Sequence, residues 1–572
     1  ITDEVLSPPD AVDDSYNLTS LSAITLPVLT NDTDANGDAL VITSFTSPTS
    51  GTLSRSAQQL IYTPSGDFGA TDSFTYTISD GRGGTDTATV TLNYQIPFTW
   101  IGSGADANWT TAANWLGGVV PGGANAAYFN SQCTTYCNPL LTANMTVGGL
   151  QINSSYAGTF TQPPGITMTV QSLGWVQYGG TFVGGNSAIN VGVYAGTGSF
   201  RLQGGSFTST TDALQLRAGL EIGAAATFLH NNGTVDIWSH GKNITVGVNP
   251  FYNFKFRSND WAAFSLSGQT MTVLSDLTLA LPTSCASYCS LNNGTVLVNG
   301  NVTISGDGFE GNALIRLVGS SNQIVDGSAA SSIGGMPSFQ VASTGGTVSL
   351  VGGVNVYGNY TYTSGTVAAG TSTVGFIGDN QTIVVGPIVY NNVKFSSIGW
   401  AAKTLSAGTL NVAGNLSLNS YSGCGSNCQI NSGAINVSGN VTVSGDGFRG
   451  NATITLNGAS AATVSGIAAL TIPSGTLTIN KDSKATTVTM SGAVNVTSAA
   501  QAMTITRGTV NLAGFALSVS GLLTVGTDAK LICGGGTVTA GSTSISGEVS
   551  CGTSLGITWL GTTGDGLWST AG

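Results

Sequence analysis

Charged residues are scarce in this chain, in which only 7% of 572 residues are Asp, Glu, Lys or Arg. Disordered chains combine high charge with low hydrophobicity, so the composition argues for a folded protein. No apolar run approaches the roughly 18 residues that a transmembrane helix requires, and no membrane insertion is expected. The apolar residues, 41% of the total, are therefore expected inside a core.

Histidine is almost missing, because the chain has only His230 and His240. Two histidines make a zinc site or a Ser–His–Asp triad a poor interpretation, and no phosphate-binding loop occurs. A glycosidase needs two carboxylates about 5–10 Å apart. Asp307 has Glu310 close by, but Arg449 replaces this Glu in a second copy of the same phrase. We therefore expect no enzymatic activity.

The few charges are unevenly distributed along the chain. The first 95 residues hold 12 acids and 2 bases, a net charge of −10, whereas all later residues together hold 15 acids and 13 bases. Nucleic-acid binding requires basic patches, so we expect no nucleic-acid partner. An acidic segment with so few bases is instead the place to look for a bound cation.

Glycine is abundant, with 81 residues, and Thr, Ser, Val and Asn are also frequent. This mixture suits short β-branched strands separated by turns. Residues 233–313 recur without a gap 139 positions later, most closely where residues 300–313 match residues 439–452. A repeat of such long period indicates a solenoid or an array.

A short phrase, Gly followed by Thr, Ser or Ala and an apolar residue, recurs at intervals such as 19, 22, 25 and 28 residues. This spacing is typical of one turn of a parallel β-helix. We therefore predict an all-β fold, with an N-terminal β-sandwich followed by a long parallel β-helix (β-solenoid). The expected domains are the sandwich, a Trp-rich cap with the first coils, two repeat blocks, terminal coils, and the start of a further repeat or docking segment: 1–95, 96–216, 217–355, 356–495, 496–557 and 558–572.

The sandwich prediction rests on alternating apolar and polar residues at 74–78 and 88–92. The phrases DAVDDSY, VLTNDTDANGDAL and YTPSGDFGATDSFTYTISDGRGGTDTATVTL, which cover residues 10–92, resemble the cadherin-like tandem domains of large bacterial surface proteins and adhesins. The resemblance implies an Ig/cadherin-like β-sandwich for this domain. In that family acidic loops often bind calcium, although Asp and Asn are also common turn residues. The resemblance implies calcium as a cofactor at Asp13, Asp14, Asn31, Asp32, Asp34, Asn36, Asp38, Asp72 and Asp80.

A second segment begins with Trp100, Trp109 and Trp115. Its pattern, TW-x-G … W … NW … P, resembles the start of β-strand-repeat regions in bacterial autotransporter-like and other secreted repeat proteins. Later phrases such as GTSTVGFIGDNQTIVVGPIVYNNVKF resemble those repeats too. The tryptophans could stack on a sugar, but the first coil of a solenoid must also be sealed. We favour the cap.

The eight cysteines lie in local pairs, three of them spaced C-x-x-x-C. Few nearby histidines favour disulfides over zinc, and disulfides place the protein outside the cytosol. Adjacent coils lie about 4.8 Å apart, within the span of a disulfide. The expected pairs are Cys133–Cys137, Cys285–Cys289, Cys424–Cys428 and Cys533–Cys551, the last linking neighbouring coils.

Asparagine occurs in many N-x-S/T sequons. Asn301 and Asn440 are equivalent positions of the two repeats, which makes them the better candidates for glycosylation. The alternative is that these residues are unmodified and form hydrogen bonds in turns and in ladders between stacked strands.

Near the end of the chain, Thr558, Trp559, Asp565 and Trp568 match the cap residues at a constant offset of 459. We expect Trp559 and Trp568 to act in assembly, either by docking onto the next subunit or as part of a longer tandem protein. The predicted function is an extracellular, cell-surface structural or adhesive repeat protein that self-associates end to end into a fibre, filament or matrix. The alternative is a surface β-helix that binds or degrades carbohydrate, with surface glycans as partners.

Overall fold

The computed structural model describes residues 6–193, 197–238, 243–258, 263–281, 289–397, 399, 401–424, 427–466, 472–473, 475–496, 501–551 and 557–559. The chain forms two compact units, residues 1–253 and 254–572. Apart from two 3₁₀ turns, η1 (Val28–Thr30) and η2 (Ala112–Asn114), the regular structure in the described part is all β. No helix there is long and apolar enough to cross a bilayer.

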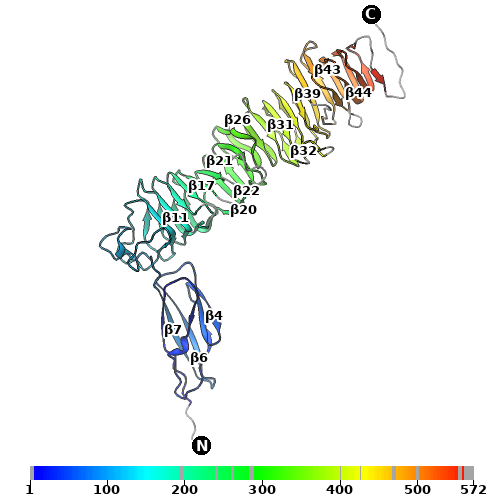
Figure 1. Ribbon diagram of the computed structural model, residues 1–572. Coiled ribbons are helices and arrows are strands. Elements are labelled where there is room, and N and C mark those ends of the chain that lie inside the picture. The colour runs from blue at the N-terminus through cyan, green and yellow to red at the C-terminus, as the bar shows by residue number, and fades with distance from the viewer. Residues whose placement is uncertain are drawn as a thin grey trace. The chain divides into compact units, whose positions relative to one another are not determined.

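The first unit begins with a sandwich of two small sheets (Figure 1). One sheet has the order β1-β7-β6-β3 and the other β2-β5-β4. Apolar side chains alternate with polar ones along β6 and β7 and point into a shared core that includes Phe74, Tyr76 and Val90. The strands are β1 (Asp14–Leu18), β2 (Ile24–Leu26), β3 (Val41–Phe45), β4 (Gly51–Ser56), β5 (Gln59–Pro64), β6 (Thr71–Ser79) and β7 (Thr85–Tyr94).

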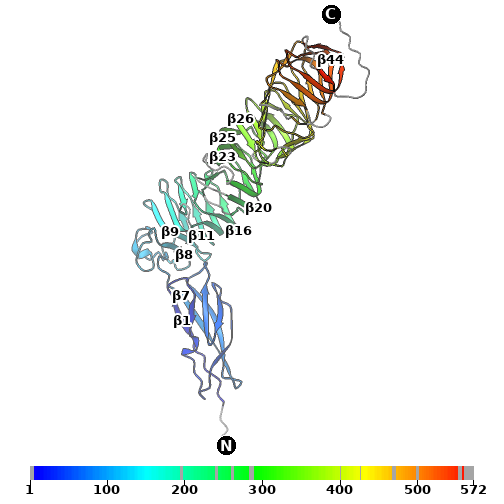
Figure 2. The ribbon, with the colours of Figure 1, turned by 45° about the vertical axis from the view of Figure 1, so that its right-hand side comes forward.

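The rest of the first unit is a parallel β-solenoid, whose stacked strands are visible in Figure 2. A strand pairs in parallel with its counterpart one coil later, as Leu214 of β15 does with Val235 of β17. The strands are β8 (Ala126–Phe129), β9 (Met145–Ile152), β10 (Thr159–Thr161), β11 (Met168–Gln177), β12 (Thr181–Val183), β13 (Ile189–Val191), β14 (Phe200–Thr208), β15 (Ala213–Leu216), β16 (Leu220–Leu229), β17 (Thr234–Trp238) and β18 (Ile244–Thr245).

The second unit is also built of parallel coils. Its strands are β19 (Asn253–Arg257), β20 (Ala263–Val273), β21 (Leu277–Ala280), β22 (Ser290–Val298), β23 (Val302–Gly308), β24 (Leu314–Leu317), β25 (Gln323–Met336), β26 (Ser338–Val356), β27 (Tyr360–Ala368), β28 (Thr373–Phe376), β29 (Gln381–Val384), β30 (Val389–Tyr390), β31 (Asn392–Ser396), β32 (Ala402–Ala407), β33 (Thr409–Val412), β34 (Leu416–Asn419), β35 (Gln429–Asn431), β36 (Ala434–Val437), β37 (Val441–Ser444), β38 (Thr453–Leu456), β39 (Ala462–Gly466), β40 (Leu477–Asn480), β41 (Thr487–Met490), β42 (Val494–Val496), β43 (Met503–Asn511), β44 (Leu517–Ile532), β45 (Val538–Ile545), β46 (Glu548–Ser550) and β47 (Ile557–Trp559).

The core of the coils consists of apolar columns. Leu277, Val302 and Val325 pair in register over three successive coils, and all three are fully buried. A coil cannot bury such residues alone, so each coil stabilises its neighbours. The predicted fold class is confirmed: an Ig-like sandwich followed by a long parallel β-solenoid.

Candidate functional site

The three tryptophans of the second segment form a buried cluster at the first coils. Trp100, Trp109 and Trp115 are 0%, 6% and 1% exposed. The rings of Trp109 and Trp115 meet edge to face at 4.6 Å, and Trp109 stacks on Phe160 at 5.7 Å. The indoles therefore lie inside the protein, where they seal the core, and present no stacking face to a sugar.

Polar residues of the same motif organise the loop around the cluster. Asn114, which is fully buried, donates from Nδ2 to the carbonyl oxygens of Asp106 (2.8 Å) and Asn108 (3.0 Å). Its Oδ1 accepts from the Gly104 amide at 2.7 Å. The hydrogen bond from the Thr111 hydroxyl holds the pKa of Asp106 below its usual value. Asp106 and Asn114 thus hold the main chain of the cap loop in place.

A disulfide pins the loop that closes the cap. Cys133 and Cys137 are bonded, with Cα atoms 5.5 Å apart. Between them, the carbonyl of Tyr136 accepts from Nε1 of Trp100 at 2.7 Å. The covalent link therefore positions the acceptor that the buried indole N–H needs.

Two further expected disulfides are present. Cys424–Cys428 spans 5.6 Å between Cα atoms, and Cys533–Cys551 spans 4.7 Å. Cys289 is disulfide-bonded, whereas Cys285 lies outside the described residues, so that pairing stays a prediction.

The best-matched part of the 139-residue repeat lies beside the C-x-x-x-C loops. The amide of Glu310 donates to the carbonyl of Cys289 at 2.9 Å, and the amide of Arg449 donates to the carbonyl of Cys428 at 2.8 Å. Both positions thus act through the main chain, which explains why Glu and Arg can exchange there. Phe309 beside the first is fully buried, as is its counterpart in the second copy. In both copies these main-chain hydrogen bonds attach the cysteine-containing loop to the coils.

The acidic residues of the sandwich mostly accept hydrogen bonds from turns. Asp34 Oδ1 accepts from the amides of Asn36 (2.8 Å) and Asp38 (3.1 Å). Asp80 Oδ1 accepts from the Arg82 amide at 2.7 Å, and Arg82 forms an ion pair with Asp38 at 2.9 Å. Three further predicted ligands also bind main-chain groups. Asp13 accepts from the Thr89 amide, Asn31 donates to the Val12 and Asp13 carbonyls, and Asn36 accepts from the Ser7 amide.

Asp14 and Asp32 come together around one hydroxyl. Tyr76 Oη lies 3.0 Å from Asp14 Oδ2 and from both carboxylate oxygens of Asp32. One hydroxyl proton serves only one acceptor. Asp14 Oδ1 also accepts from the Tyr16 hydroxyl at 3.2 Å, and Asp32 Oδ1 accepts from the Val12 amide at 2.8 Å. Burial raises the pKa of both carboxyls.

The nine predicted ligands do not form one site. Asp72 lies near the start of β6 and Asp80 directly after its end, which separates them by about 26 Å at 3.3 Å per residue. Within the described part of the chain, no three acidic, His or Cys side chains are arranged to hold one metal ion. Calcium binding stays a prediction.

Asp72 instead belongs to a buried network at the other end of the sandwich. It accepts from the amides of Thr49 (3.0 Å) and Ser50 (2.9 Å) and from the Tyr62 hydroxyl (2.7 Å). Tyr62 also meets the Tyr94 hydroxyl at 2.6 Å. Burial alone would raise the pKa of Asp72, but these hydrogen bonds, led by that from Tyr62, lower it.

The sandwich docks onto the first coils through residues 66–70. The carbonyl of Phe68 accepts from Nδ2 of the fully buried Asn153 at 2.5 Å, and Asp67 Oδ1 accepts from the Ser154 amide at 2.8 Å. The Phe68 ring stacks on Tyr94 at 4.9 Å. Sequence reasoning missed this junction, because its partners lie 85 and 87 residues apart.

The asparagines proposed for glycosylation have engaged amides. Asn301 donates from Nδ2 to Asp276 Oδ1 at 3.0 Å, and its Oδ1 accepts from the Ile324 amide at 2.8 Å. Asn440 Oδ1 accepts from the Thr463 amide at 2.8 Å. These bonds join neighbouring coils and fit the ladder interpretation; glycosylation stays a prediction.

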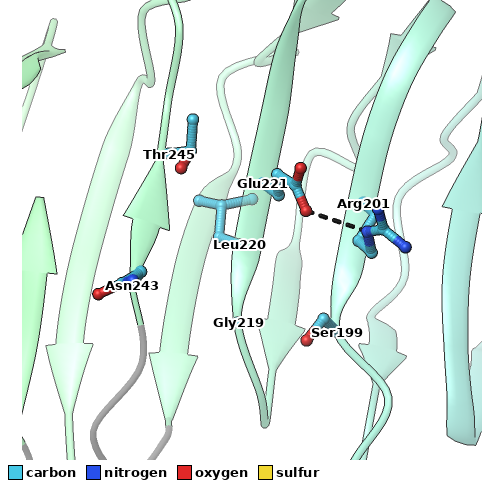
Figure 3. Close-up of a pocket in the computed structure, with 7 residues that line it drawn as sticks. All are labelled: Ser199, Arg201, Gly219, Leu220, Glu221, Asn243 and Thr245. Carbon is cyan, nitrogen blue, oxygen red and sulfur yellow. Dashed lines mark hydrogen bonds and ion pairs between the residues drawn. The ribbon is translucent and has the colours of Figure 1, made fainter. Parts of the chain in front are cut away.

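A shallow hollow of about 480 Å³ lies on the face formed by β14, β16 and β18 (Figure 3). Arg201 and Glu221 form an ion pair across it at 3.0 Å, with side chains 44% and 45% exposed. Exposed pairs of this kind contribute little stability. The lining residues are Ser199, Arg201, Gly219, Leu220, Glu221, Asn243 and Thr245.

Of the predicted assembly residues, Trp568 lies outside the described part, and only the backbone of Trp559 is described, in β47. That strand pairs in parallel with β45, with Trp559 opposite Ala540.

Residues 7–93 match the bacterial Ig domain family. No curated protein and no solved structure matches the chain. A bacterial Ig domain joined to a long β-solenoid fits a bacterial surface repeat protein. The domain match and the disulfides are consistent with an extracellular or surface location.

Proposed function

We propose that this chain is an extracellular structural or adhesive protein whose β-rich units associate end to end into a cell-surface fibre, filament or matrix. The observation that carries the proposal is the pairing of the second motif copy. In the first copy, Thr99 bridges to Tyr128 in parallel. In the second, Thr558 and Trp559 pair in parallel with Thr539 and Ala540. The second copy therefore continues the ladder of coils, as strand addition requires.

Deletion of residues 558–572 tests the proposal. The full chain is expected to form polymers visible by electron microscopy, and the truncated chain to remain as single particles. A matched control replaces Thr558 with Ser, which keeps the backbone pairing and should polymerise normally. Equal polymerisation of the truncated and full chains would contradict docking through this segment.

Carbohydrate binding is the alternative outcome. Its sequence support was the tryptophan cluster, whose rings are buried. Glycan binding that quenches tryptophan fluorescence, without polymer formation, would favour a surface β-helix with a glycan partner over the structural role. The proposal assigns the chain no catalytic step.

A further inference from the structure

Buried glutamines occupy corners of the coils in the second unit. Gln381 is 1% exposed and donates from Nε2 to the carbonyl oxygens of Val356 (2.8 Å) and Gly358 (2.6 Å), one coil earlier. Gln323 and Gln501 make the same type of paired contact. These bonds orient the carboxamide and leave its Oε1 able to accept a hydrogen bond from the following coil.

A lysine follows Gln381 in this column. Lys403 in β32 pairs in register with Gln381 in β29 and is 0% exposed. Its Nζ donates to Gln381 Oε1 at 2.8 Å and to the carbonyl of Gly378. Burial lowers the pKa of Lys403 to about 7, although the negative charge of Asp379 opposes the shift. A substantial share of this amine is therefore neutral at neutral pH, and a neutral amine is a nucleophile.

We propose that Lys403 and Gln381 form an isopeptide cross-link between neighbouring coils. In this step the lone pair of Nζ attacks Cδ of Gln381, an Nζ–Cδ bond forms, and the Cδ–Nε2 bond breaks. One proton passes from Nζ to the departing nitrogen, which leaves as ammonia. No oxidant, reductant or co-reactant is needed.

The surroundings favour this reaction through proximity. Both side chains are excluded from solvent and held in contact, so the reaction is intramolecular and gains from proximity. Attack requires the carboxamide plane of Gln381 to turn about its terminal torsion, which is soft for an sp²-terminated side chain, so that a face of Cδ meets Nζ. This turn gives up the two Nε2 hydrogen bonds to the preceding coil. Asp379 lies two residues before Gln381, and its charge acts on Lys403. Burial raises the pKa of Asp379, and the positive charge of Lys403 opposes that shift.

The product would be a covalent staple across one coil, closing a separation of 22 residues. Unlike Cys533–Cys551, which also joins neighbouring coils, it would survive reduction. Such a link would resist separation of the coils, whatever the chain assembles with, so the inference does not depend on the proposed function.

Mass spectrometry of the purified, reduced full chain tests the proposal. The intact mass is expected to be lower than the sequence mass by one ammonia. A proteolytic digest should yield a branched peptide that joins Lys403 to Gln381, with no cleavage after Lys403. Loss of ammonia at an Asn-Gly step would also lower the mass, so the branched peptide is the decisive product.

Two variants sharpen the test. Lys403→Met should restore the sequence mass at this site and abolish the branched peptide. Lys481→Met is the matched control, because Lys481 is also buried but donates only to the backbone carbonyls of Ser438 (3.0 Å) and Asn457; the cross-link should persist in it. A free Lys403 in the native protein, or a mass deficit that remains in Lys403→Met without a branched peptide in the parent chain, would overturn the proposal.

Discussion

Turn amides need hydrogen-bond acceptors in both the sandwich and the solenoid, but the two regions supply them with different side chains. In the sandwich the acceptors are aspartates, such as Asp34 and Asp80. In the solenoid they are mainly asparagines of the preceding or following coil. Asn392, Asn415 and Asn440 form one column in which each Oδ1 accepts from an amide of the next coil, at 2.9, 3.0 and 2.8 Å.

The difference follows from the spacing of the turns. Coils stack about 4.8 Å apart, so an aspartate at each corner would place like charges side by side. Two charges about 4 Å apart repel by about 1 kcal/mol in water and by more near a protein surface. The sandwich turns do not stack, and Asp is acceptable in each. One cause thus explains both the acidic first module and the many sequons of the neutral body.

An aspartate at the equivalent corner of the first repeat supports this account. Asp276 stands 139 residues before Asn415 and accepts from the Asn301 amide at 3.0 Å. The next corner, Asn301, is neutral. A carboxylate is therefore tolerated where the next corner carries an amide.

Breaking the solenoid cap should have the largest effect. Trp115→Ala removes a 1% exposed indole from the cluster that seals the first coils. We expect a loss of about 3–5 kcal/mol in the free energy of unfolding, measured by denaturant titration of the full chain. Val119→Ala is the control, since Val119 is 56% exposed and its loss should matter little. A Trp115→Ala chain as stable as the control would show that the cap does not limit solenoid stability.

Calcium should stabilise the sandwich and leave the solenoid unaffected, because the acidic residues are concentrated in the sandwich. Binding to the folded form alone adds about 2.7 kcal/mol at a hundredfold excess over Kd. Hydrogen exchange of the full chain, with calcium and with chelator, should show added protection around Asp14 and Asp32 and none in the coils. Asp32→Asn is expected to weaken the response. Identical exchange in both conditions would remove the metal assignment.

Lowering the pH should destabilise the sandwich through Asp72. The pKa of Asp72 is lowered in the folded state, so its stabilisation is present above the unfolded pKa of about 3.9 and disappears as the pH falls through the folded value. Asp72→Asn should cost about 1.5 kcal/mol at neutral pH. The variant and the parent should converge as the pH falls through the lowered folded pKa of Asp72. Exchange of the Thr49 and Ser50 amides measures this locally, and a pH-independent difference would contradict it.

The comparison also marks what sequence alone can predict. Alternation at 74–78 and the recurring Gly phrase were enough for the sandwich and the coils, because both patterns are local. The cap was recognisable from its tryptophans. The contact of Asn153 with Phe68 was not recognisable, because its partners lie 85 residues apart in the sandwich and the first coils. The contact of Lys403 with Gln381 was not recognisable either, because it depends on coil lengths that vary along the chain.

The smallest expected effect concerns the asparagine column itself. Asn415→Asp and Asn440→Asp each keep an oxygen acceptor, so either alone should change stability only slightly, as Asp276 indicates. Together they place two carboxylates at adjacent corners. We expect the double variant to lose about 1 kcal/mol more than the sum of the single variants, measured by a double-mutant cycle.

The cause of that coupling can be checked with salt and with a reverse control. At 1 M salt the Debye length falls to about 3 Å, so the coupling energy should largely vanish if it is charge repulsion. Asp276→Asn should leave stability nearly unchanged, because its amide replaces a carboxylate whose neighbouring corner, Asn301, is neutral. A coupling energy that is equally large in high salt would mean that the corners prefer asparagine for its hydrogen-bonding geometry, and the electrostatic contrast between the two regions would be wrong.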